Sequence, residues 1–162
     1  MFTGIIEHSG TIEALALNDD GGRITIHAPS VAPSLAVSNS IAVNGCCLTI
    51  VDLHNGRLSA DLSGETIRKT SFGAKNGELK KSARVNLEQP LTAGKEFGGH
   101  FVLGHVDTIG RVTRLTPKEK TGGLASKFLK NSRVTSCQKA RSPLTASASP
   151  SQAGTITSPK SQ

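Results

Sequence analysis

Leu48–Leu62, LTIVDLHNGRLSADL, carries the clearest β-structure signal in the chain. Two short runs of strand-forming residues, Leu48–Leu53 and Arg57–Leu62, flank the turn Leu53-His54-Asn55-Gly56. An Asn-Gly pair tolerates positive φ at little cost, as tight hairpin turns require. The stretch therefore predicts a β-hairpin.

Similar short strands flank this hairpin on both sides. A second turn is expected at Asn18–Gly22, and one short helix over Ser63–Thr70, with Ser63 as N-cap and Glu65 in the first turn. Six or seven strands in about ninety residues predict an all-β chain with a small closed barrel. The other candidate strands are Phe2–Glu7, Gly10–Leu17, Arg23–His27, Ser40–Val43 and Ala83–Glu88.

The chain also repeats itself at an offset of one hundred residues. Phe2–Leu15 aligns with Val102–Leu115, and a second copy of the barrel is expected to start near residue 98. The matching pairs are Gly4 with Gly104, Ile6 with Val106, Gly10 with Gly110, Ile12 with Val112 and Leu15 with Leu115.

The charge of the chain is unevenly distributed. Residues 1–119 contain twelve basic and twelve acidic residues, so the net charge of +7 arises from the seven basic residues of 120–162. A basic segment rich in Ser, Thr and Pro predicts a disordered tail. It could attract phosphates, but it lacks the aromatic platforms of single-strand binders, so we expect no specific nucleic-acid partner.

Composition also limits the compartment and the metal chemistry. The 162 residues, 36% of them apolar, suffice for one domain or two small barrels. No apolar run approaches the ~18 residues of a membrane span, and the start lacks a basic signal segment. Cys46, Cys47 and Cys137 form neither a disulfide framework nor a paired zinc motif. A cytoplasmic protein without a metal is expected.

Five motifs, in order and with family-like spacing, resemble riboflavin synthase, whose subunit is a tandem of two lumazine-binding barrels. They are Met1–Ile5, Ser40–Thr49, Asp61–Thr66, Val85–Glu88 and Gly98–Asp107. The resemblance implies a six-stranded Greek-key barrel over residues 1–97 and the start of a second repeat over 98–120. The incomplete second repeat is then followed by the disordered tail, 121–162.

The resemblance implies a transferase of riboflavin biosynthesis that dismutates two molecules of 6,7-dimethyl-8-ribityllumazine. The products are riboflavin and 5-amino-6-ribitylamino-pyrimidinedione, and no cofactor is needed. Each family site lies between the first barrel of one subunit and the second barrel of a neighbour in a trimer. A chain without its second barrel is expected to keep one ligand-binding half-site, or to form a dimer. The alternative is a non-catalytic lumazine or flavin carrier.

The resemblance also implies the site residues. Ser40, His105 and Cys47 are the candidate catalytic residues. The substrate-binding positions are Gly4, Ile5, Ile6, Cys47, Leu48, Thr49, Asp61, Leu62, Ser63, Gly64, Glu65, Thr66, Gly104, His105 and Val106.

Each group of site residues also has a purely structural interpretation. Ile5, Ile6 and Leu48 could be barrel core. Ser40 and Thr49 could bond local backbone at strand ends. Ser63 and Glu65 could serve only as helix caps. His100 and His105, five apart on a strand, point to opposite faces and cannot share a metal ion. Cys46 and Cys47, adjacent on a strand, are likewise expected to face opposite sides. Cys47 could be a small pocket-lining or buried residue instead of a nucleophile.

The tail contains a possible change of reading frame. When the third base of each codon is taken as the first, Ser142–Ser151 permits Ile-Ala-Val-Asp-Gly-Ile-Ser-Leu-Thr-Val, the expected counterpart of Ile41–Ile50 one hundred residues later. We hypothesise that one base was gained or lost near Thr121–Leu124. The coding DNA tests this, since the hypothesis requires a shifted frame that encodes a barrel.

Overall fold

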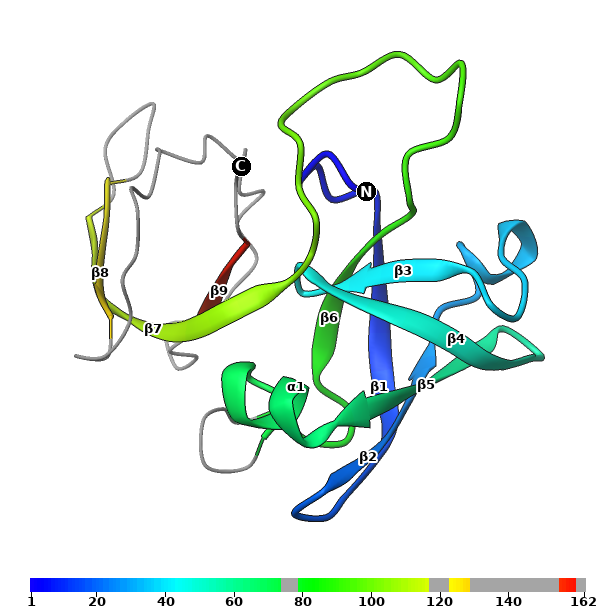
Figure 1. Cartoon of the computed structure of the whole chain (residues 1–162), viewed down its shortest axis with the longest axis horizontal. Coiled ribbons are helices and arrows are strands. Elements are labelled where there is room, and N and C mark those ends of the chain that lie inside the picture. Colours follow the sequence, from blue (N-terminus) through cyan, green and yellow to red (C-terminus); the bar gives the residue numbers. More distant parts are fainter. Residues whose placement is uncertain (74–78, 117–122, 129–154, 160–162) are drawn as a thin grey trace.

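The computed structural model describes residues 1–73, 79–116, 123–128 and 155–159. Six antiparallel strands close into a barrel in the order β1-β2-β5-β4-β3-β6, with β6 pairing back onto β1 (Figure 1). The predicted all-β class and six-stranded barrel are confirmed. The strands are β1 (His8–Leu17), β2 (Gly21–His27), β3 (Ser40–Val43), β4 (Cys46–His54), β5 (Arg57–Ser63) and β6 (Arg84–Glu88).

The connections make β2 to β5 a Greek key. Two hairpins join β3 to β4 and β4 to β5, while the longer β2–β3 connection, with the 3-10 helix η1 (Ala32–Ser34), lets β2 pair with β5. The predicted hairpin over Leu48–Leu62 is confirmed. Asn55 and Gly56 in its turn adopt φ of 48° and 74°, the left-handed conformation expected of an Asn-Gly turn.

The core fills the inside of the barrel. Alternate residues along each strand point inward, and closure covers them from every side. Apolar side chains supplied by all six strands therefore lose nearly all contact with water. The core residues are Ile12, Ile24, Ile26, Ala28, Val31, Ile41, Val43, Cys46, Leu48, Ile50, Leu58, Ala60, Leu62, Phe72, Val85 and Leu87.

The predicted helix forms as α1 (Gly64–Lys69), between Ser63 at its N-cap and Thr70 at its C-cap. The Ser63 Oγ accepts a hydrogen bond from the Thr66 backbone N–H at 3.1 Å, which satisfies one of the free donors of the first turn. Phe72 follows the helix and belongs to the core, so the chain returns to the barrel directly after α1.

The N-terminal segment differs from the prediction. Phe2–Glu7 was expected as a strand, but only Phe2 forms a β-bridge, to Val102. Gly4 adopts φ of 80°, which interrupts an extended conformation. The Thr3 and Gly4 N–H groups donate to the Glu88 carboxylate instead of to a neighbouring strand. For these two N–H groups, a side-chain carboxylate thus takes the place of a strand carbonyl as acceptor.

The chain continues from the barrel into a separate sheet. The strand β7 (Val106–Thr116) lies between β8 (Gly123–Phe128) and β9 (Thr155–Pro159), away from the barrel in Figure 1. Its pairing with β8 reproduces that of β1 with β2 at an offset of one hundred: Ile12↔Ile26 corresponds to Val112↔Ser126, and both ladders shift at the next pair. The backbone pairing of β7 with β8 therefore resembles that of β1 with β2.

The tail also differs from the prediction in part. Residues 123–128 and 155–159, expected to be disordered, form β8 and β9. The physical reason is that the N–H and C=O groups along both edges of β7 take partners there. The rest of the predicted tail, including Ser142–Ser151, lies outside the described residues.

Candidate functional site

The β3–β4 hairpin brings two predicted site residues side by side. Ser40 is the register partner of Thr49, and Ala42 is the partner of Cys47. Partners in an antiparallel pair point to the same face, and these four residues share the outer face of the barrel. Ser40 is half-buried and Thr49 is exposed, so both hydroxyls lie on a surface that a ligand could reach.

The two adjacent cysteines face opposite sides, as predicted. Cys46 is buried in the core, and burial, with a smaller contribution from Cys47, raises the pKa of its thiol to about 12. Cys47 is half-buried on the outer face. Both are free thiols. A thiol with so high a pKa is not a nucleophile at neutral pH, so of the two only Cys47 is placed for chemistry.

Gly104 lies directly against Cys47. The Cys47 backbone N–H donates to the Gly104 carbonyl oxygen at 2.9 Å. Gly104 adopts φ of 80°, and a Cβ at this position would lie 2.7 Å from the Cys47 Cβ. Only glycine allows both the conformation and the close approach. Two predicted site positions more than fifty residues apart in the sequence are therefore in contact.

An open seam separates β4 from β5 near this contact. The two strands pair from Ile50↔Ala60 to His54↔Arg57, and among the described residues no ladder pair joins Cys46–Thr49 to Asp61–Ser63. The Cys47 N–H points away from β3, toward Gly104. Because the direction of backbone groups alternates along a strand, the Thr49 N–H faces the same way. The seam thus has a strand edge on the side of β4.

The far side of the seam is the junction of β5 with α1. Leu62 is buried in the core, and Gly64 is buried. Ser63 and Thr66 share the cap described above, and their hydroxyl oxygens lie 3.0 Å apart. Thr66 is half-buried, so its hydroxyl stands at the border of the helix and the solvent.

The charged residues of this junction are already paired. Asp61 is exposed and forms an ion pair with Arg23 at 2.6 Å, and the hydrogen bond from the guanidinium lowers the pKa of the Asp61 carboxyl. Glu65 is exposed and pairs with Lys69 at 2.6 Å, which lowers the pKa of Glu65 and raises that of Lys69. Glu65 thus lies in the first turn of α1 and forms an i,i+4 ion pair along the helix, while Ser63 provides the N-cap.

The remaining predicted site residues differ in how exposed they are. Ile5 and Ile6 are exposed, 50% and 47%, and so are not barrel core. His105 is exposed, while its neighbour Val106 packs on the core. Among the described residues, no side-chain hydrogen bond joins His105 to Ser40 or Cys47. The candidate catalytic residues are thus not linked as a hydrogen-bonded relay.

Sequence reasoning gave no role to one residue that anchors a predicted site position. Glu88 is 4% exposed and accepts hydrogen bonds from Gly4 N–H. Its place after Val85 and Leu87 in an alternating strand indicates only that it points outward. Its burial follows from the N-terminal turn that covers it, which no local pattern reveals.

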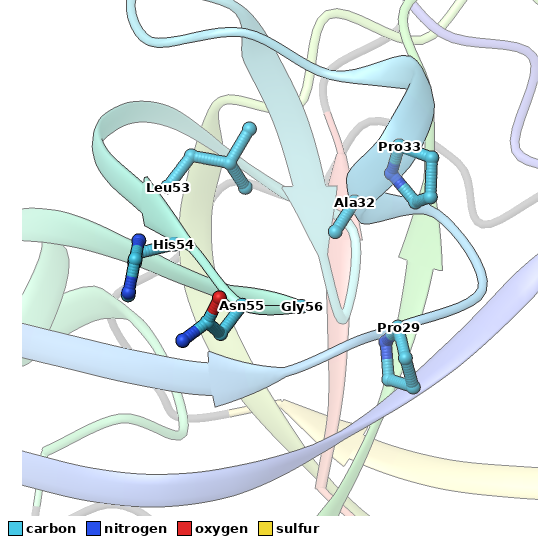
Figure 2. Close-up of a pocket in the computed structure, with 7 residues that line it drawn as sticks. All are labelled: Pro29, Ala32, Pro33, Leu53, His54, Asn55 and Gly56. Atoms are coloured by element: carbon cyan, nitrogen blue, oxygen red, sulfur yellow. The ribbon is translucent and has the colours of Figure 1, made fainter.

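One hollow on the surface lies away from the seam. It has a volume of about 380 Å³ between η1 and the β4–β5 turn (Figure 2), and no predicted site residue lines it. A smaller hollow of about 70 Å³, beside the N-terminal segment, is lined in part by Ile5 and Glu88.

The described residues contain no cluster of three metal-ligating side chains, and none of their helices is long and apolar enough to cross a membrane.

Comparison with curated sequences finds riboflavin synthases. The chain is 41% identical over 118 residues to "Riboflavin synthase" of Bacillus subtilis (strain 168), which is 73% of this chain and 53% of the relative. It is 42% identical over 120 residues to that of Mycobacterium tuberculosis (strain ATCC 25618 / H37Rv), 74% of this chain and 58% of the relative. The chain therefore spans about half the length of these relatives.

Comparison with solved structures finds LumP. The crystal structure of LumP complexed with 6,7-dimethyl-8-(1'-D-ribityl) lumazine has a TM-score of 0.71 and 29% identity, covering 81% of this chain and 71% of LumP. LumP complexed with riboflavin has a TM-score of 0.69 at the same identity, covering 80% and 68%.

A family model described as "Lumazine binding domain" matches residues 3–90. The match includes all six barrel strands, the β3–β4 hairpin with Cys47 and the junction of β5 with α1. Since it covers more than half of the chain, this chain belongs to the lumazine-binding domain family.

Proposed function

We propose that the barrel binds 6,7-dimethyl-8-ribityllumazine and serves a riboflavin synthase-type dismutation, with one ligand-binding half-site on this chain. The observation that carries the proposal is the coincidence of the family match, residues 3–90, with a closed barrel that has one open seam. The resemblance to riboflavin synthases and to ligand-bound LumP supports the choice of ligand.

The seam suits the chemistry of the ligand. The pyrimidinedione edge of a lumazine alternates hydrogen-bond acceptors and donors, which backbone groups at this edge of β4, such as the Thr49 N–H, can match. The outer-face hydroxyls of Ser40 and Thr49 add two groups that can donate or accept. In this proposal Thr66, across the seam, takes the ribityl hydroxyls.

The reaction itself needs positioning and proton transfer. A four-carbon unit leaves one lumazine and joins the other, so two flat heterocycles must be held face to face. In the proposal one of them occupies the seam, and a second barrel supplies the facing half. Ser40 and His105 are the groups we propose for proton transfer, with a neighbouring chain in a trimer or dimer as the partner, in the cytoplasm.

Fluorescence titration with the lumazine and with riboflavin tests the binding, alongside a turnover assay. Thr49→Val removes a seam hydroxyl without changing the β-branched shape, and we expect about three- to tenfold weaker lumazine binding from the loss of one hydrogen bond. Thr11→Val, on β1, is the matched control and should bind like the parent. No binding of the lumazine by the parent at millimolar concentration would overturn the proposal.

A second candidate is a non-catalytic lumazine or flavin binder. It is favoured by the LumP structures with riboflavin and with flavin mononucleotide, both at 29% identity. Binding of lumazine and riboflavin with no product formed, even at high protein concentration, would select this candidate. Full turnover by this chain alone would select the enzyme and refute the half-site.

A further inference from the structure

Glu88, at the end of β6, is a buried carboxylate held by one short segment of the chain. Its side chain accepts hydrogen bonds from the Thr3 N–H at 2.5 Å and the Thr3 hydroxyl at 2.7 Å. It also accepts the Gly4 N–H, at 3.1 Å to Oε2 and 3.2 Å to Oε1. A carboxylate on a residue only 4% exposed has lost most of its contact with water, and these bonds replace that contact.

Glu88 lies in the same row as the candidate site. The register pairs Glu88 with Ala42, and Ala42 with Cys47, so the three side chains follow one another across β6, β3 and β4 on the outer face. Ser40, two residues before Ala42, points to the same face. The Thr3-Gly4 turn is therefore fixed on the same wall of the barrel as Ser40 and Cys47.

A second set of contacts extends from this turn to the seam. Phe2, one residue before the turn, exchanges backbone hydrogen bonds with Val102, at 2.7 Å and 3.0 Å. Two residues later Gly104 accepts the Cys47 N–H. The segment 102–104 is thus held at one end by the N-terminal segment and at the other end by the candidate site.

We propose that Glu88 is a positioning residue of the lumazine site: by fixing the Thr3-Gly4 turn, it holds the Val102–Gly104 segment against Cys47. The placing of this segment follows from the contacts alone, while the effect on ligand rests on the proposed function. The role requires a carboxylate. It accepts every bond, whereas an isosteric amide would turn its NH₂ group toward the Gly4 N–H or, in the flipped orientation, toward all three donors.

The test combines Glu88→Gln with two readouts, alkylation of each cysteine followed by mass spectrometry and lumazine affinity. Release of the turn should expose Cys47 and raise its alkylation rate at least about fivefold, while Cys46, inside the barrel, should stay protected. Lumazine affinity should fall about tenfold or more, since hydrogen bonds to a charged group are the stronger ones. Glu96→Gln is the matched control, because Glu96 is exposed and forms no ion pair with another described residue.

The outcomes separate the two proposals. Faster alkylation of Cys47 in Glu88→Gln supports the positioning role even when the parent binds no lumazine, a result that defeats only the proposed function. Unchanged Cys47 alkylation and unchanged affinity overturn the role. If Glu88→Gln exposes both cysteines, the barrel has opened, and Thr3→Val decides. It removes one bond to Glu88, so Cys47 alone should become faster to alkylate and Thr3→Ser should restore the parent rate, whereas no effect of Thr3→Val overturns the role.

Discussion

The strands β1 and β7 begin from similar sequences and end in different surroundings. In both strands the pairing register shifts by one residue at equivalent positions. The shift falls between Ile12 and Ala14 in β1 and between Val112 and Arg114 in β7. β1 belongs to a closed barrel in which every strand has two neighbours, whereas β7 is the centre of a three-stranded sheet. The comparison teaches that the repeated motif specifies local pairing and bulge, while closure depends on the strands that follow.

The largest effect should separate an apolar side chain of β1 from one of β7. Ile12 is 0% exposed in the barrel core, so we expect Ile12→Ala to lower the free energy of unfolding by about 2–5 kcal/mol. Val106→Ala, in β7, should lower it by less than about 2 kcal/mol, because Val106 is only half-buried where it packs on that core. Urea denaturation measures both, and equal losses would contradict the contrast.

The next effect concerns the repeated glycines, Gly4 and Gly104, which both adopt φ of 80°. Gly4→Ala should cost about 1–2 kcal/mol from the left-handed backbone alone, since its nearest neighbour would be 3.5 Å from the added Cβ. Gly104→Ala adds a clash 2.7 Å from the Cys47 Cβ. We expect it to displace residue 104 and to weaken lumazine binding more than Gly4→Ala does in the same titration.

A smaller effect should distinguish the alkylation rate of Cys46, inside the barrel, from that of Cys47, on the outer face. The Cys46 pKa of about 12 means that its thiolate is scarce at pH 7 to 9 and becomes abundant only near pH 12. Cys47 should therefore be alkylated at least about tenfold faster than Cys46 at pH 8. Peptide mapping after timed alkylation checks the ratio. Equal rates would show that burial does not protect Cys46.

The smallest effect is expected on the barrel surface. Arg23 lowers the pKa of Asp61, so this ion pair persists above the ordinary carboxyl range and is lost as the pH falls through the lowered value. Both side chains are more than half exposed, so Asp61→Asn should leave the thermal midpoint at pH 7 within experimental error. A clear loss of stability would show that the barrel depends on its surface charges as well as its core.

Several features of the fold and site could be predicted from local sequence. The Asn55-Gly56 hairpin, the Ser63 cap and the opposite orientation of Cys46 and Cys47 each depend on residues within a few positions of one another. The expected strand over Phe2–Glu7 was wrong because its partner is a distant carboxylate, Glu88, rather than a neighbouring strand. The contact of Gly104 with Cys47 likewise has no local signature.

The sequence by itself determined the strand order along the chain, the turn positions and the repeat, because periodicity and turn chemistry act over a few residues. Only the tertiary structure decided which residues share the candidate site. Closure of the barrel leaves β4 and β5 unpaired at one end, and the N-terminal turn covers Glu88. Such contacts depend on the path of the whole chain, which no short window of residues contains.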